Sequence, residues 1–270
     1  MPVLKDITLG QFFPGHSAIH RMDPRTKLIL TIVYIVALFV AQNWISHLVM
    51  MAFLVFCIWL SKIPPKSILR GMKPLVFILV FTAVLNLFYT DGGVELVRFG
   101  SLAITSEGLK RAIFMIWRIL MLISGTFLLT YTTSPISLTD GLESLLNPLK
   151  RIHVPVHELS MMMSIALRFI PTLIEETDKI MNAQKARGAD FETGSIIQRA
   201  KALVPILVPL FISAFRRADE LATAMECRCY QGGEGRTKMK LLRFGRVDLY
   251  AFSVCICLLA AVITLAAFGL

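Results

Sequence analysis

Long apolar runs separated by short polar segments fill the first half of the chain, and one further run closes it. The closing run carries no charged residue. The second and third runs are slightly shorter than the roughly 20 residues that a helix needs to cross the hydrocarbon core of a bilayer. This pattern predicts an all-α, polytopic membrane protein with about five transmembrane helices. The runs cover residues 26–41, 45–60, 74–89, 112–130 and 249–270.

Residues 134–246, between the fourth and fifth runs, have a pattern of a different kind. The segment is too long for a connector and too apolar for a disordered tail. Apolar residues recur at steps of three and four, which predicts three amphipathic helices: one over 137–150, a second from 156 towards Arg187, and a third that ends near Cys229. The apolar stripe of the second helix is Met161, Met162, Met163, Ala166, Phe169, Ile170 and Leu173, and that of the third is Phe211, Phe215, Ala218, Ala222, Met225 and Cys229.

A short apolar stretch, residues 203–215, leaves the number of crossings open. Its length and its two prolines, Pro205 and Pro209, favour a half-buried approach to the third amphipathic helix over a full span. A sixth crossing at this stretch is the alternative. It would put the C-terminus inside.

Composition and charge agree with a membrane protein. Apolar residues make up 56% of the chain and charged residues 17%, against about 25% charge in an ordinary soluble domain. Lys and Arg are concentrated in residues 1–27, 61–73 and 134–246, and residues 42–44 contain none. Because basic segments stay on the cytoplasmic side, we expect these three segments in the cytoplasm and the C-terminus outside. Residues 1–24 lack the pattern of a signal peptide and are expected to form a cytoplasmic lead-in.

The sequence contains no recognised catalytic or metal-binding motif. A phosphate-binding Gly-x-x-x-x-Gly-Lys-Ser/Thr loop, a Gly-x-Ser-x-Gly elbow and a His-Glu-x-x-His pair are all missing. His153 and His157 are four residues apart, but Pro155 between them disfavours one continuous helix. We therefore expect no metal and no cofactor bound by this chain. The five cysteines are interpreted as small apolar filling, since an odd number does not make a disulfide framework.

Two features inside the helices have two interpretations each. Arg118 lies in the fourth apolar run, where a charge can face a partner or a substrate path. It can also extend to the outer interface, which its position near one end of the run favours. Met161, Met162 and Met163 are either ordinary core or an adaptable surface for several partners, because thioether side chains repack at low cost.

Two arginines, each at the end of a long amphipathic helix and set among small residues, are the candidate functional groups. They are Arg187 and Arg228. Small neighbours let a partner approach the backbone closely, and the planar guanidinium can then make a bidentate contact with a carboxylate or with carbonyl oxygens. A single such arginine is most simply explained as binding the last carbonyls of its own helix. Two in matching positions favour docking to a partner.

These residues resemble the paired signatures of the transmembrane T subunit of energy-coupling factor transporters, a family related to CbiQ-type proteins. The resemblance covers essentially the whole chain. One departure is that Cys227 and Cys229 stand where the family usually has Ala and Gly. Since Cys229 lacks the backbone freedom of glycine, we expect the third helix to end differently. The similar stretches are Ala183-Gln184-Lys185-Ala186-Arg187-Gly188-Ala189, Ala224-Met225-Glu226-x-Arg228-x-Tyr230, and His20-Arg21-Met22-Asp23-Pro24-Arg25-Thr26-Lys27-Leu28.

The resemblance implies a scaffold that couples two ABC-type ATPases to a small membrane protein that captures a vitamin or metal ion. It divides the chain into a membrane domain (1–133), a cytoplasmic coupling domain (134–246) and a C-terminal transmembrane helix (247–270). It also implies that the two amphipathic stripes given above contact the substrate-binding S component, and that ATP and Mg²⁺ are bound by the partner subunits. The implied ATPase-docking residues are Ala186, Arg187, Gly188, Glu226, Cys227, Arg228 and Cys229.

Two other classes of protein compete with this interpretation. One is a basic membrane-associated enzyme or lipid-binding protein on anionic headgroups, with Glu175, Glu176 and Asp178 as its acidic residues, although no nucleophile and base accompany them. The other is a stand-alone permease, which the lack of inverted repeats disfavours. The family resemblance places the protein in the plasma membrane of a bacterium or archaeon.

Overall fold

The computed structural model describes residues 12–89, 92, 95–99, 102–191, 195–233 and 241–267. Within these ranges the chain is helical apart from a two-stranded antiparallel hairpin, so the all-α prediction is confirmed. Two terminal segments lie outside the described residues: residues 1–11 of the expected lead-in and residues 268–270 of the closing apolar run.

Contacts divide the chain into two compact units. We call the first the bundle (Gly10–Leu142 and Leu242–Leu270) and the second the crossing unit (Met1–Leu9 and Glu143–Leu241). The functional divisions expected at 133/134 and 246/247 stay a prediction, since these units are defined by contacts and not by function.

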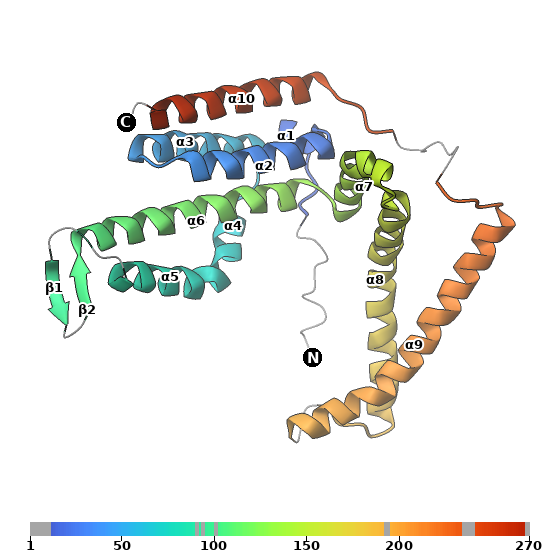
Figure 1. Ribbon diagram of the computed structural model, residues 1–270. Coiled ribbons are helices and arrows are strands. Elements are labelled where there is room, and N and C mark those ends of the chain that lie inside the picture. The colour runs from blue at the N-terminus through green and yellow to red at the C-terminus, as the bar shows by residue number, and fades with distance from the viewer. Residues whose placement is uncertain are drawn as a thin grey trace. The chain divides into compact units, whose positions relative to one another are not determined.

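The bundle contains most of the long apolar helices. Figure 1 shows α2 alongside both α6 and α10, and the contacts of α2 with these two helices agree. The strands pair antiparallel, with Phe99 opposite Leu102 next to the turn. The elements in order are α1 (Ala18–Arg21), α2 (Pro24–Val40), α3 (Trp44–Ser61), α4 (Pro65–Met72), a 3-10 turn (Lys73–Leu75), α5 (Val76–Tyr89), β1 (Glu95–Phe99), β2 (Leu102–Thr105), α6 (Ser106–Thr132), the first part of α7 (Pro135–Leu146) and, after the crossing unit, α10 (Arg246–Ala267).

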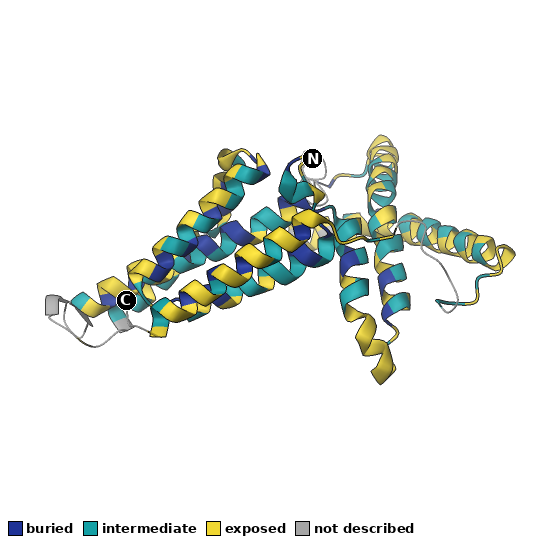
Figure 2. Cartoon of the chain, turned by 90° about the horizontal axis from the view of Figure 1, so that it is seen from above, coloured by how far each residue is buried: buried dark blue, intermediate teal, exposed yellow. Residues whose placement is uncertain are grey.

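The core of the bundle is formed where α2, α3, α6 and α10 meet. Tyr34 is buried there, and its hydroxyl donates a hydrogen bond to the carbonyl of Met121 at 3.2 Å. A glycine is required opposite this ring, because a Cβ on Gly125 would lie 2.5 Å from a Tyr34 ring carbon. Figure 2 shows the buried residues on the inward faces of these helices and exposed residues on their outer faces. The core cluster consists of Tyr34, Ala37, Leu38, Ala41, Met50, Leu54, Met121, Leu258 and Val262.

A buried carboxylate joins the starts of α2 and α10. Asp248 is 3% exposed. One of its oxygens accepts from the Asp23 amide at 2.9 Å and the other from the Gly245 amide at 2.7 Å. Asp23 in turn caps α2 through the Arg25 amide and forms an ion pair with the Arg25 guanidinium at 2.9 Å. The segment His20–Leu28 noted in the sequence thus closes one end of the bundle.

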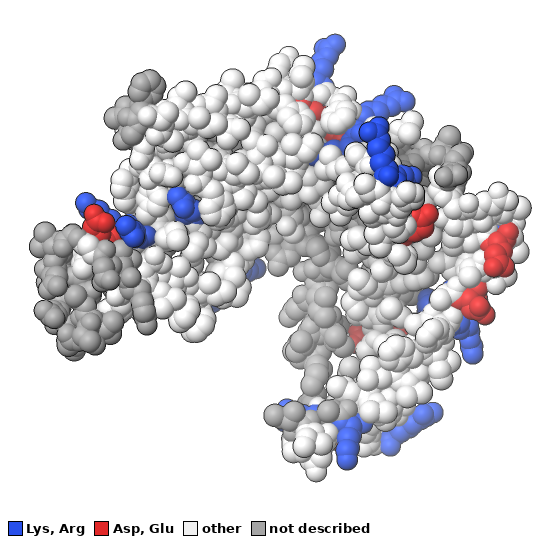
Figure 3. All heavy atoms as spheres, in the orientation of Figure 1, with Lys and Arg blue, Asp and Glu red and all other residues white. Residues whose placement is uncertain are grey.

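Five helices among the described residues are long and apolar enough to cross a membrane. This number agrees with the prediction, but the set differs. The run predicted as the first span forms α2, which is only 17 residues long and is not among the five. Residues 203–215, which were predicted to form a half-buried approach, belong to one of the five, Ile197–Cys227. Figure 3 shows that the bundle face in view carries almost no charge between its ends. The five are Trp44–Ser61, Pro65–Phe88, Ser106–Thr132, Ile197–Cys227 and Arg246–Ala267.

Arg118 contacts the end of a neighbouring helix, and its expected extension to the outer interface stays a prediction. Its guanidinium donates to the carbonyl of Ala41 at 2.8 Å and lies over the rings of Phe39 and Phe114. Because Ala41 is the C-cap of α2, the cation sits at the negative end of that helix, where a positive charge is stabilising. Arg118 is therefore a structural link between α6 and α2.

The crossing unit consists of the rest of α7, a 3-10 turn (Asn147–Ile152), α8 (Val156–Ala186) and α9 (Ile196–Cys227). The three predicted amphipathic helices are therefore present. Residues 203–215, expected as a half-buried approach to the third helix, are part of that helix, because α9 runs unbroken through Pro205 and Pro209 for 32 residues. Its start is fixed by a capping box, in which Ser195 and Gln198 exchange side-chain and backbone hydrogen bonds. Helix α8 likewise continues through Pro171.

Candidate functional site

The first arginine end, residues 184–189, terminates α8 in a defined backbone motif. Arg187 is the C-cap residue, and Gly188 follows it with a left-handed φ of +87°. The Gly188 amide donates to the Lys185 carbonyl at 2.9 Å. The Ala189 amide donates to the Gln184 carbonyl at 3.0 Å. This pair of bonds is the Schellman motif, in which glycine takes the left-handed position without a steric penalty.

The second arginine end, residues 225–230, repeats this motif position for position. Arg228 is the C-cap residue of α9, and Cys229 follows with φ of +54°. The Cys229 amide donates to the Glu226 carbonyl at 2.8 Å, and the Tyr230 amide donates to the Met225 carbonyl at 3.0 Å. The expectation that a cysteine here would make the helix end differently is therefore wrong. The left-handed conformation is retained, at a cost of about 1–2 kcal/mol for a residue with a Cβ.

Both guanidinium groups are available to a partner. Arg187 and Arg228 are exposed. Neither guanidinium makes a hydrogen bond or an ion pair with another residue in the part of the chain that the structure describes. The backbone motif satisfies the last carbonyls of each helix with amides, so the arginine side chains are not needed for that purpose. Their neighbours Ala186, Gly188 and Cys227 are exposed as well, which leaves the helix ends open to close approach.

Helices α8 and α9 are joined by a carboxylate. Glu176 of α8 accepts hydrogen bonds from the hydroxyl of Ser213 and from the guanidinium of Arg217, the latter at 3.0 Å. The hydrogen bond from Ser213, followed by the charge and hydrogen bond of Arg217, lowers the pKa of Glu176 below its ordinary value. Glu176 is thus part of a helix crossing and not of a solvated acidic face.

A second contact between α8 and α9 involves a backbone carbonyl that has no hydrogen-bond donor within its own helix. Pro209 has no amide hydrogen, so the Pro205 carbonyl loses its helical donor. The side-chain amide of Gln184 lies 3.4 Å from this oxygen and donates to it. Gln184 also belongs to the first arginine end. The proline pair and the first arginine end are therefore parts of one arrangement.

These two contacts place the arginines at opposite ends of the crossed pair. Glu176 meets residues 213 and 217, whereas Gln184 meets Pro205, so α8 and α9 run in opposite senses. Arg187 lies just beyond the Gln184 contact, and Arg228 lies three turns beyond the Arg217 contact in the other direction. At 1.5 Å per residue, the two arginines are separated by about 33–39 Å along the helix axes. Figure 1 shows the two helix ends apart in the same way.

The segment after the second arginine end returns to the start of α8. A Cβ on Gly233 would lie 2.4 Å from a ring carbon of His157, so the backbone lies directly on this ring. On α7, Glu143 bonds His157 Nδ1 at 3.1 Å and accepts from the Ser160 hydroxyl at 3.1 Å. His157 is therefore held between α7 and the chain that follows Arg228, a role that the sequence pattern did not suggest.

The predicted S-component stripes are largely uncovered within the crossing unit. Phe211 and Phe215 are 61% and 72% exposed, and Met162 and Met163 are 54% and 47% exposed. The other stripe residues are half-buried or exposed, and none is buried: Met161, Ala166, Phe169, Ile170, Leu173, Ala218, Ala222 and Met225. The interpretation of the three methionines as ordinary core is therefore wrong for Met162 and Met163, and their surface is open to a partner or to lipid.

The cysteines were interpreted as buried filling, and this is correct for only part of the set. Cys255 is buried and Cys57 is half-buried. Cys227, Cys229 and Cys257 are exposed. Two of these exposed thiols flank Arg228, within the second arginine end.

The fold and the two arginine ends define a class: a multi-pass membrane protein that presents two matching cationic helix ends on a crossed helix pair. The family model described as cobalt transport protein, CbiQ, matches residues 15–239. Proteins named energy-coupling factor transporter transmembrane protein EcfT are similar over most of the chain. The one from Thermosediminibacter oceani is 58% identical over 92% of this chain and 94% of its own. Those from Ruminiclostridium cellulolyticum and Listeria innocua are 53% and 47% identical, over 97% and 91% of this chain and 97% and 93% of their own.

The chain therefore belongs to the EcfT family and is the transmembrane component of an energy-coupling factor transporter. The resemblance noted from the two arginine ends and from residues 20–28 is confirmed. Since these relatives are bacterial and the helices are apolar, the protein is located in a cell membrane.

Proposed function

We propose that this chain couples two ABC-type ATPases to a membrane-embedded S component that captures a vitamin or a metal ion. Arg187 docks on one ATPase and Arg228 on the other. The single observation that supports this most directly is the repeat of one Schellman motif, with an exposed arginine at its C-cap, at the two far ends of a crossed helix pair. Two equivalent contact points about 33–39 Å apart along the helix axes suit two copies of one kind of partner.

Each docking contact uses the arginine together with its small neighbours. Gly188 and Cys229 hold the left-handed position, Ala186 and Cys227 keep the approach open, and Glu226 lies on the exposed side of the second end. The guanidinium then enters a groove on the ATPase and makes a forked contact with a carboxylate or with carbonyl oxygens. The ATPases bind ATP and Mg²⁺, and this chain binds no cofactor and catalyses no reaction.

The uncovered stripes of α8 and α9 contact the S component. Charged residues avoid the Met161–Leu173 and Phe211–Met225 stripes, in which Met162, Met163, Phe211 and Phe215 are exposed. Burying such a surface against an apolar partner is favourable by roughly 25 cal/mol per Å². Movement of the ATPases is transmitted by the crossed helices to this surface.

This function requires the crossing unit, the N-terminus and residues 61–73 to lie in the cytoplasm, with the C-terminus outside. Helix α9 then lies along the membrane or on its surface and does not cross it, although its length and composition would permit a crossing. Charged residues on both halves of α9, among them Arg199, Lys201, Asp219 and Glu220, favour this position.

The docking assignment is tested by the double change Arg187→Glu and Arg228→Glu. We expect the double variant to insert into membranes normally but to lose co-purification with the ATPases. Arg199→Glu, which changes an exposed arginine of α9 outside the arginine ends, is the matched control and should leave co-purification unchanged. Undiminished ATPase binding by the double variant would refute the assignment. The single changes to Lys should cause partial loss, because the charge remains but the fork is lost.

A further inference from the structure

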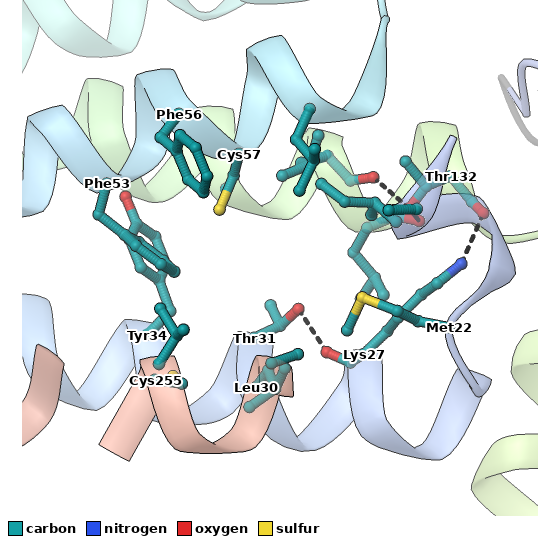
Figure 4. A pocket seen from close by; sticks show the side chains of 18 of the residues that line it. Met22, Lys27, Leu30, Thr31, Tyr34, Phe53, Phe56, Cys57, Thr132 and Cys255 are labelled. Atoms are coloured by element: carbon teal, nitrogen blue, oxygen red, sulfur yellow. Dashed lines mark hydrogen bonds between the residues drawn. The ribbon is translucent and has the colours of Figure 1, made fainter. Parts of the chain in front are cut away.

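A cavity of about 260 Å³ lies inside the bundle. Its walls come from α1, α2, α3, α6 and α10. Figure 4 shows Phe53, Phe56 and Cys57 of α3 on one side of the space, and Leu30, Thr31 and Cys255 on the other. The cavity belongs to no part of the proposed coupling function.

The shape of the cavity is elongated along the helices. On α2 the lining positions are Lys27, Leu30, Thr31 and Tyr34, and the other long helices repeat this spacing of three and four residues over two turns. Two turns correspond to about 10 Å at the rise of an α-helix. A volume near the lower end of the roughly 300–1,000 Å³ range of sites for drug-sized ligands, drawn out over this length, suits one flexible chain better than a ring system.

The polar groups at the cavity already have partners within the protein. The Tyr34 hydroxyl donates to the Met121 carbonyl, and the Thr31 hydroxyl donates to the Lys27 carbonyl at 2.8 Å. The Lys27 ammonium donates to the Thr132 carbonyl at 2.8 Å. A polar ligand would lose its hydration here without gaining hydrogen bonds, which is unfavourable. The chemistry of the walls therefore selects hydrocarbon.

The exposed part of the cavity wall lies on α3 and α10, and we infer that the cavity opens there. Four lining residues on these helices are exposed: Phe56 at 52%, Val247 at 39%, Tyr250 at 69% and Val254 at 50%. Helices α3 and α10 are both long and apolar enough to cross a membrane. Their outer surface therefore faces the acyl chains of the bilayer, and the opening is continuous with that surface.

We propose that this cavity is a binding site for one acyl chain of a membrane phospholipid, inserted from the bilayer between α3 and α10. The chain fills the space left between Phe53 and Cys57 on α3 and Cys255 on α10. The inference rests on the membrane location of the bundle and not on the docking of ATPases.

The test uses the full-length protein in nanodiscs that contain phosphatidylglycerol with a photoactivatable diazirine in its acyl chain. After illumination, peptides are mapped by mass spectrometry. We expect labelling around Phe53–Cys57 and Val254–Cys255, and at least a threefold loss of it in Cys57→Phe, which fills the cavity. Thr31→Leu provides a second filling variant in case Cys57→Phe does not fold. Cys257→Phe is the matched control, because Cys257 is exposed on the same helix as Cys255 and does not line the cavity.

Two outcomes would overturn the proposal. One is labelling confined to outward-facing positions such as Phe77 of α5, which is 79% exposed, because this would indicate ordinary contact with surrounding lipid. The other is labelling of the cavity by a diazirine fatty acid but not by the phospholipid, because the occupant would then be a free acid. Labelling by the phospholipid that both filling variants reduce, and that Cys257→Phe leaves unchanged, supports it.

Discussion

The side-chain amide of Gln184 in α8 donates to the carbonyl oxygen of Pro205 in α9, at 3.4 Å. This oxygen is the one that Pro209 leaves without a helical donor. The contact explains how α9 tolerates a proline pair without breaking, and it ties the first arginine end to the middle of the partner helix. A substitution of Gln184 should therefore reduce the local stability of α9, on the other side of the crossing.

Replacing Gln184 by Leu keeps the size of the side chain but removes the donor. A hydrogen bond of this kind contributes about 0.5–1.5 kcal/mol, so we expect amide exchange around residues 203–209 to accelerate by up to about tenfold. Hydrogen–deuterium exchange of the purified protein measures this. In a Pro209→Ala background the new amide supplies the missing donor, and Gln184→Leu should then have little effect. An equal effect in both backgrounds would contradict the pairing.

The Glu176–Arg217 contact should make the crossing depend on pH. Hydrogen bonds from Ser213 and Arg217 hold the pKa of Glu176 below its ordinary value, so the ionised carboxylate stabilises the crossing. This stabilisation is present at neutral pH and is lost as the pH falls through the lowered pKa. We expect distances between spin labels on α8 and α9 to broaden in acid. Glu176→Gln should remove most of this pH dependence, and Glu175→Gln, on the exposed neighbour, should retain it.

The left-handed position at the second arginine end predicts opposite effects for two adjacent cysteines. Cys229→Gly removes the strain of a side chain at φ +54° and should stabilise the helix end by about 1 kcal/mol. Cys227→Gly, inside the helix, should destabilise it by about the same amount. Exchange protection of the Tyr230 amide, which closes the motif, measures both, with a change of about fivefold in each direction. Changes of the same sign would show that the backbone strain is not important.

The bond between Arg118 and Ala41 predicts that substitutions at two arginines of α6 lower the stability by different amounts. Arg118→Leu leaves the Ala41 carbonyl without its donor and should cost about 1–3 kcal/mol. Arg111 forms only an exposed pair with Glu107 at 3.7 Å, so Arg111→Leu should cost less than about 0.5 kcal/mol. Unfolding of the purified variants in mixed micelles compares them. Similar losses for both would argue against a helix-capping role for Arg118.

The two exposed cysteines beside Arg228 allow the side of the membrane to be tested. In a Cys257→Ser background, a membrane-impermeant maleimide should label Cys227 and Cys229 in inside-out vesicles and not in right-side-out vesicles. Replacing both cysteines by Ser should abolish the signal. Labelling from the outside would mean that α9 crosses the bilayer, which would reverse the proposed location of the second arginine end.

Regular patterns in the sequence were sufficient to predict the class of fold and to locate the two arginine ends. Steps of three and four predicted the amphipathic helices, and the small residues around Arg187 and Arg228 marked the ends that the structure then assigned to one motif. The continuity of α9 was missed because Pro205 and Pro209 normally interrupt a helix, and the compensating donor, Gln184, is distant in sequence.

The roles of isolated polar residues were predicted less well. Arg118 and Glu176 have partners on other helices, at Ala41 and Arg217, and no local spacing indicates them. The conformation of Cys229 was also missed, since glycine is the usual residue at that position and a cysteine there goes against local preference. For Arg118 and Glu176 the tertiary contact, and not the local sequence, decides the role.

The crossing unit has almost no hydrophobic core of its own, and this has a consequence for the stability of the protein in the cell. Of its described apolar residues, only Val156, Phe191 and Ile206 are buried. A newly synthesised subunit without its partner subunits would thus expose apolar side chains that chaperones and proteases recognise. Abundance of the orphan chain should then be set by degradation, so that balanced production of all subunits becomes a condition for its survival.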